Sequence, residues 1–144
     1  MLATMLFVVA FDNRTALLSA RDAWCSDRTA AEATYGPIGD WDVSKITDLS
    51  YVFCADANSW AHQDCNTNCQ NFNENISNWN TSRVTKLDHT FAHQVYFNQP
   101  LDWDTSRVTS FSVSRSSVVC VSFLLQLTVH LIAFAAHLCW NDLL

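Results

Sequence analysis

An internal repeat constrains this chain more than any other feature of its 144 residues. The block W-D-V-S-K-I-T-D-L, which begins at Trp41, returns 38 residues later at Trp79 and 24 residues after that at Trp103. The second and third copies are identical at six of these nine positions. A period in the twenties is typical of solenoids, in which short units stack and bury one shared core.

Composition excludes several classes of function. The chain carries eight Lys and Arg residues and a formal net charge of −6, so it offers no basic face for a phosphate backbone. We therefore expect no nucleic-acid partner. Its two glycines, Gly36 and Gly39, are too few for the Gly-rich loops that hold nucleotide phosphates. The nucleophile motif G-x-S-x-G is also absent, and we expect neither an enzyme nor a cofactor.

Each repeat unit is predicted to make one coil, with a brief strand followed by a tight turn. One coil cannot enclose its own apolar row, so the rows of successive units should align in one core. The positions expected in this core are Trp41, Trp79, Trp103, Ile46, Val84, Val108, Leu49, Leu87, Phe53 and Phe91. The hydroxyls of Thr47, Thr85 and Thr109 should bond turn backbone or the equivalent group one coil away.

The first 34 residues hold an apolar segment and a predicted helix. Residues 1–11 are apolar but lack the basic start of a secretory signal, so a signal peptide and a buried segment both remain open. Residues 16–25 place apolar side chains at mostly helical spacing, which predicts one amphipathic helix that covers the open end of the stack. Residues 26–34 read as a polar connector.

A specific resemblance rests on the run F-N-Q-P-L from Phe97 and the run W-D-T-S-R-V-T from Trp103. These motifs resemble the BspA-like leucine-rich-repeat surface proteins, whose repeat was catalogued as a domain of unknown function in bacterial surface lipoproteins. The resemblance extends from about residue 11 to residue 111. It implies a protein of the cell surface or secreted space, associated with adhesion and protein binding, whose repeat carries no known catalytic residue.

The chain departs from the family pattern in three respects. Leu49, Leu87 and Phe111 stand where the family usually has Met, which is a tolerable apolar exchange. The first repeat carries an insertion, residues 54–70, and the third stops at Arg115, where Phe is expected. Two to three units are few for a solenoid, so a gene fragment or mispredicted product is one interpretation.

The insertion is the stretch in which chemistry is most plausible. Cys54, His62, Cys65 and Cys69 are ligand types for zinc, although their spacing matches no common zinc motif. In an exported chain, disulfides are favoured over a metal site. With Cys25 included, the four cysteines allow three pairings, which the sequence leaves open.

Two further groups are weaker metal candidates. His89 and His93 lie four residues apart and would share a face of a helix, but exposed polar residues are the favoured reading. Four carboxylates flank the tryptophans and could bind Ca²⁺ along the stack, although turn and solvation roles are favoured. These carboxylates are Asp40, Asp42, Asp102 and Asp104.

Composition changes after residue 115. Residues 118–140 contain no formal charge and, as a helix, would span about 34 Å, enough for a bilayer core. Arg107 and Arg115 precede this stretch, which would place the repeats in the cytoplasm by the positive-inside rule. Read-through sequence in place of a further repeat is the competing interpretation.

These observations predict an α+β repeat fold. It is a short leucine-rich-repeat-like solenoid of two to three coils, with an N-terminal capping helix and a hydrophobic C-terminal helix. The parts are residues 1–34, the repeats at 35–115 and a candidate membrane segment at 116–144.

The predicted function is a non-enzymatic protein-binding or adhesion module, membrane-anchored at the cell surface or secreted. The alternatives are a metal-binding or catalytic domain built on the Cys/His insertion, and a non-functional gene fragment. Bound zinc in the unoxidised protein would favour the metal site. A mass lower by two hydrogens for each cysteine pair would favour the exported module.

Overall fold

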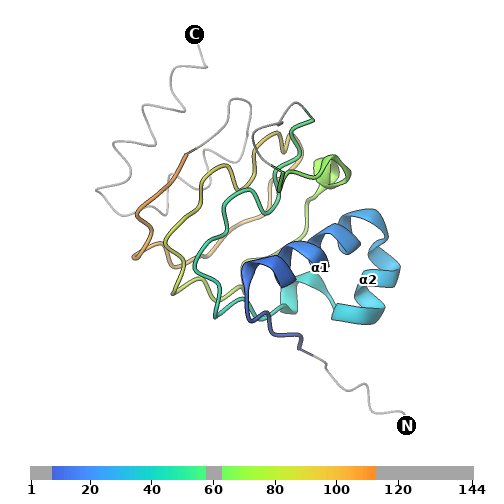
Figure 1. Cartoon of the computed structure of the whole chain (residues 1–144), viewed down its shortest axis with the longest axis horizontal. Helices are drawn as coiled ribbons and strands as arrows, with labels where there is room; N and C mark the ends of the chain where they lie inside the picture. The colour runs from blue at the N-terminus through green and yellow to red at the C-terminus, as the bar shows by residue number, and fades with distance from the viewer. Residues whose placement is uncertain (1–7, 58–62, 113–144) are drawn as a thin grey trace.

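A computed structural model describes residues 8–57 and 63–112 of the chain. It contains the α-helices α1 (Arg14–Ser26) and α2 (Arg28–Tyr35) and the short 3-10 helices η1 (Ile38–Asp40) and η2 (Thr67–Asn71). Figure 1 shows α1 and α2 together at one end, with the repeats as successive loops of backbone beside them. We call residues 38–53, 76–91 and 101–112 units 1, 2 and 3.

The predicted α+β leucine-rich-repeat solenoid is wrong. The described residues contain no β-strand, because the extended part of each unit is long enough only for isolated parallel bridges. One bridge joins Ala10 to Asp42, and two others link Asp48, Lys86 and Ser110. Turns follow directly on these positions, so the brief strand expected in each repeat does not form, while the tight turn does.

The N-terminal helices begin and end at identifiable caps. Asn13 caps α1 by accepting a hydrogen bond from the Ala16 amide, and Asp27 caps α2 by accepting one from the Ala30 amide. Helix α1 spans the stretch that was predicted as helical. The polar connector expected after it is instead mostly helix α2, because Asp27 supplies a second helix start.

Several predictions fall on residues outside the described part of the chain. The apolar start at residues 1–7 and the hydrophobic segment at 116–144, with its candidate span 118–140, both lie there. Among the described residues, no helix has the length and apolar character needed to cross a bilayer.

The three repeat tryptophans lie in one column. The ring centroids of Trp41 and Trp79 are 6.5 Å apart, and those of Trp79 and Trp103 are 6.1 Å apart, with nearly parallel planes in both pairs. Each indole N–H also finds a partner in the preceding segment. Trp79 donates to the Ile38 carbonyl at 2.8 Å, and Trp103 donates to the Ile76 carbonyl at 2.9 Å. Every unit is thereby joined to the one before it by both stacking and a hydrogen bond.

The other predicted core positions are also buried, and phenylalanines form a second column. Phe72, which follows the insertion, stacks on Phe53 at 3.9 Å and on Phe97 at 5.7 Å between ring centroids. The apolar side chains that are buried in the core at the predicted positions are Trp41, Ile46, Leu49, Phe53, Trp79, Val84, Leu87, Phe91, Trp103 and Val108.

Backbone hydrogen bonds run between equivalent positions of neighbouring units. Those from unit 1 to unit 2 include the Leu49 amide to the Lys86 carbonyl at 3.0 Å, and the next pair along is the Leu87 amide to the Ser110 carbonyl at 2.9 Å. The predicted role of the threonine hydroxyls is confirmed. Thr85 Oγ1 donates to the Thr47 carbonyl at 3.1 Å, and the Thr109 hydroxyl donates to Thr85 in the same way.

Candidate functional site

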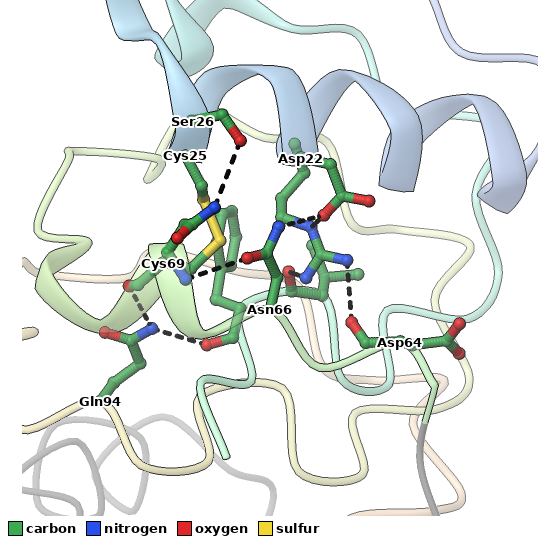
Figure 2. Close-up of a disulfide and its surroundings, with 11 residues drawn as sticks. Asp22, Cys25, Ser26, Asp64, Asn66, Cys69 and Gln94 are labelled. Atoms are coloured by element: carbon green, nitrogen blue, oxygen red, sulfur yellow. Dashed lines mark hydrogen bonds and ion pairs between the residues drawn. A yellow bond between two sulfur atoms is a disulfide. The ribbon is translucent and has the colours of Figure 1, made fainter. Parts of the chain in front are cut away.

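Two disulfides constrain the insertion, one within it and one that joins it to α1. Cys25 of α1 is bonded to Cys69 of η2 (Figure 2). Cys54, the residue directly after unit 1, is bonded to Cys65. All four candidate cysteines are therefore oxidised, and none offers a thiolate to a metal. The fourth candidate zinc ligand, His62, lies outside the described residues.

Buried Arg21 anchors the insertion from inside. Its guanidinium, on α1, donates to the Val52 carbonyl at 2.6 Å and to the Asp64 carbonyl at 2.8 Å. Its side chain is only 2% exposed, and it lies 2.9 Å from a carboxylate oxygen of Asp22. Burial lowers the pKa of Arg21, and the neighbouring carboxylates of Asp22 and Asp64 oppose that shift. The guanidinium therefore ties α1, unit 1 and the insertion together.

Amide side chains complete the attachment of the insertion. Gln94, fully buried, donates from Nε2 to the Cys69 carbonyl at 2.7 Å (Figure 2). The same nitrogen donates to the Phe53 carbonyl, also at 2.7 Å. Asn66 donates from Nδ2 to Asp22 at 2.6 Å, also shown in Figure 2. Because these bonds reach η2, α1 and the segment after unit 2, they hold the insertion in one position.

A polar groove lies next to this attachment, across the face where the units are bridged. Its volume is about 430 Å³. The lining side chains come from equivalent positions in the three units, joined by Arg14 of α1 and Asp64 of the insertion. They are Arg14, Asp48, Ser50, Tyr51, Asp64, Lys86, Asp88, His89, Ser110 and Ser112. We call this cavity the ladder groove.

Charges of both signs meet at one side of the ladder groove. Arg14 donates to a carboxylate oxygen of Asp64 at 2.8 Å and also to the Ser50 carbonyl. Asp48 lies 3.9 Å from the Arg14 guanidinium and 3.8 Å from Lys86 Nζ, so both cations face it loosely. Asp64 reaches this side because the Cys54–Cys65 disulfide and Arg21 hold its backbone there.

Asp88 occupies the other side of the ladder groove. Its carboxylate accepts a hydrogen bond from the Ser110 hydroxyl at 2.5 Å. None of the ion pairs formed within residues 8–57 and 63–112 includes Asp88. The carboxylate therefore has a hydroxyl partner and no cation among the described side chains.

Two aromatic rings from equivalent positions lie beside Asp88. Tyr51 and His89 stack with centroids 5.2 Å apart and planes 26° apart. Both residues have left-handed backbone, with φ of 61° and 53°. Burial raises the pKa of the Tyr51 hydroxyl, and the carboxylates of Asp88, Asp48 and Asp64 raise it further. The ring pair thus sits in a locally negative environment.

The two histidines singled out by the sequence do not share a helix face. His89 and His93 lie in turns, both with left-handed backbone. His93 Nε2 lies 3.5 Å from a carboxylate oxygen of Asp56, beside a second hollow of about 390 Å³. His89 and His93 therefore lie in different surroundings, His89 in the ladder groove and His93 beside the second hollow.

The aspartates that flank the tryptophans take local roles. Asp42 and Asp104 each accept a hydrogen bond at 2.9 Å from the amide two residues on, that of Ser44 or Ser106. Bonds from these serines lower the pKa of both carboxylates. Asp40 and Asp102 are exposed. Among the described residues, no three His, Cys, Asp or Glu side chains are grouped so that they could hold a metal ion.

The sequence interpretation missed most of the ladder groove. Arg14, Asp64 and Asp88 were not singled out, because they belong to a cap, an insertion and a variable repeat position. One signal was available. Aligning the units at their tryptophans places Asp48, Lys86 and Ser110 in one column, and the bridges follow that column.

Comparison with known proteins gives one match. No curated protein matches the chain, and no solved structure matches it. Residues 26–114, more than half of the chain, match the model of a family described as "Mycoplasma protein of unknown function, DUF285". The matched range contains all three repeat units, the insertion and α2.

Proposed function

We propose that this chain, which belongs to the family described as Mycoplasma protein of unknown function, DUF285, is a non-enzymatic protein-binding module of the cell surface or secreted space. The finer likeness of the runs at Phe97 and Trp103 to BspA-like surface repeats supports this role. The ladder groove is the surface that we assign to binding, since it collects side chains from every unit.

One observation carries the extracellular part of the proposal. The two disulfides use all four cysteines in the described residues. Disulfides persist in oxidising compartments and are rare where thiol reductants are abundant. A chain whose insertion depends on two of them therefore suits the outside of the cell.

The nature of the ladder groove supports binding rather than catalysis. Its side chains form hydrogen bonds and ion pairs mostly with one another, as Arg14 does with Asp64 and Ser110 does with Asp88. Rows of polar groups repeated from unit to unit suit recognition of a partner surface, where many modest contacts add up.

The compartment can be tested on the chain in its native cells. Intact cells are treated with a membrane-impermeant biotin reagent, and the cysteines are alkylated before and after reduction. We expect surface or medium labelling and alkylation of the four cysteines only after reduction. Labelling only in broken cells, with free cysteines, would rule the proposal out.

Binding by the ladder groove can be tested with a photocrosslinking side chain. We place it at Lys86, which is exposed in the ladder groove, and, as a matched control, at exposed Arg83 of the same unit. On intact partner cells, a discrete crosslinked protein is expected from position 86 and not from position 83. Equal patterns from the two positions would contradict the assignment of this face.

A further inference from the structure

We propose that the ladder groove recognises an arginine side chain of the partner protein, with Asp88 as the carboxylate that pairs with it. This inference rests on the proposed protein-binding function and specifies its chemistry. Three features of the ladder groove support it: a carboxylate with no cation among the described side chains, an aromatic pair beside it, and an arginine of the chain itself bound nearby.

The carboxylate of Asp88 is the first feature. It accepts one hydrogen bond, from Ser110, whereas a carboxylate has two oxygens with several acceptor directions. Lys86 of the same unit is directed to Asp48 instead, with its Nζ 3.8 Å from that carboxylate. Asp88 is therefore the acidic group in the ladder groove that a cation from outside can still neutralise.

The stacked rings are the second feature. Tyr51 and His89 line the same cavity as Asp88, with ring centroids 5.2 Å apart. Aromatic faces attract a guanidinium, and they cover its apolar stem as well. Burial raises the pKa of Tyr51, and the nearby carboxylates of Asp88, Asp48 and Asp64 raise it further. A guanidinium there would meet a charge and a flat surface together.

Arg14 is the third feature, because it shows how this groove holds a guanidinium. Its two terminal nitrogens reach the Asp64 carboxylate and the Ser50 carbonyl, a carboxylate and a backbone oxygen on adjacent segments. Asp88 is the equivalent of Ser50 one unit further on, and it presents its carboxylate where the first unit presents a serine hydroxyl. The cavity of about 430 Å³ leaves room beside Arg14 for a second planar cation.

The test uses the full oxidised chain and a fluorescein-labelled hexa-arginine peptide, followed by fluorescence anisotropy at physiological salt. Asp88→Asn removes the charge and keeps the side-chain shape. The matched control is Asp102→Asn, which changes the net charge equally at an exposed position outside the ladder groove. We expect Asp88→Asn to weaken binding by about tenfold, as for one charge-assisted pair, and Asp102→Asn by less than about twofold.

The ring pair is tested in the same assay. Tyr51→Phe keeps the ring and should bind as the native chain does. Tyr51→Asn removes the ring but tolerates left-handed backbone, and it should weaken binding by about threefold. A hexa-glutamate peptide serves as the charge-reversed probe and should not bind.

Three results would overturn the inference. These are absence of hexa-arginine binding, equal weakening by Asp88→Asn and Asp102→Asn, and binding of hexa-glutamate at comparable affinity. The proposed function fails separately. If the chain crosslinks a surface protein through position 86 and Asp88→Asn leaves that crosslink intact, the module remains and only the arginine assignment is lost.

Discussion

The repeat units and the insertion reach a fixed structure in opposite ways. In the units the same contacts recur: indole on indole, an indole N–H to the preceding isoleucine carbonyl, and amides bonded to equivalent carbonyls. In its described residues, 54–57 and 63–70, the apolar side chains that the insertion buries are the small ones of Cys54, Ala55 and Cys69. It depends instead on two disulfides, on Arg21 and on Gln94.

The difference shows how stability is distributed along this chain. A repeated core spreads its stabilisation over many similar contacts, because each unit covers the next. An insertion without a core concentrates it in a few covalent and charged links. Since Asp64 of the insertion lines the ladder groove, the binding surface depends on both arrangements.

The largest effect is expected from removing the central ring of the tryptophan column. Trp79→Ala loses stacking on Trp41 and on Trp103 and removes the indole hydrogen bond to the Ile38 carbonyl, so it should cost about 3–5 kcal/mol. Urea unfolding of the oxidised chain measures this cost. Arg83→Ala, at an exposed position of the same unit, is the control and should change stability by less than about 0.5 kcal/mol. A cost below about 1 kcal/mol for Trp79→Ala would show that the column does not carry the core.

Removal of the disulfides should come next. The Cys25–Cys69 bridge closes 44 residues and the Cys54–Cys65 bridge closes 11. Replacing each pair by alanines should cost about 2–4 kcal/mol, with the longer loop at the upper end. Urea unfolding gives the totals, and hydrogen exchange locates them. Amides of units 2 and 3 should stay protected when those of the insertion open. Equal loss of protection everywhere would mean that the two regions fold as one.

The buried guanidinium should matter less than a bridge but more than a surface charge. Arg21→Met keeps much of the buried stem and leaves the carbonyls of Val52 and Asp64 without donors, which should cost about 2 kcal/mol. The same substitution at Arg28, whose side chain is 53% exposed, is the control and should cost below about 0.5 kcal/mol. Thermal unfolding compares the two variants. Equal melting temperatures would contradict the role of Arg21 in holding the insertion in place.

The smallest effect is a dependence on pH that differs between units. The pKa values of Asp42 and Asp104 are lowered by their serines, so these carboxylates stabilise the folded chain above the pKa of the unfolded state, near 4. That contribution is lost as the pH falls through the lower folded pKa. Unit 2 has Asn80 at the equivalent position, with the same turn.

Asp42→Asn with Asp104→Asn gives all three units the amide. The double variant should be less stable than the native chain by a few tenths of a kcal/mol at pH 7, because solvent screens both groups, and this difference should be smaller at pH 3. Urea midpoints at the two pH values check this. A gap that persists unchanged at pH 3 would assign the effect to turn geometry rather than charge.

The recurring contacts could be predicted from the sequence, because the residues that make them recur at equivalent positions of the repeat units. The tryptophan positions and the threonine hydroxyls follow from aligning the units, and the structure places both in columns. Sequence reasoning failed on strands. The early residues of each unit were expected to form a brief strand before the turn that contains Leu49, but the extended backbone makes only isolated bridges before the turns at Tyr51 and His89.

The candidate site was less accessible to sequence reasoning, because its parts come from unrelated segments. Nothing in the local pattern around Arg14 or Asp64 indicates that they meet, 50 residues apart. The pairing of the cysteines likewise depends on where the insertion folds back on α1, and spacing alone left three pairings open.

The bond from each repeat tryptophan to the isoleucine of the segment before it has a consequence for how such a chain can lengthen. Trp79 donates backwards to Ile38, and Trp103 donates backwards to Ile76. A duplication that copies one whole period therefore brings a new donor and a new acceptor in matching order, and the added segment is complete at both joints. A partial copy would leave either the indole donor or the carbonyl acceptor without its partner. Duplication of whole periods therefore preserves these hydrogen bonds, whereas duplication of part of a period does not.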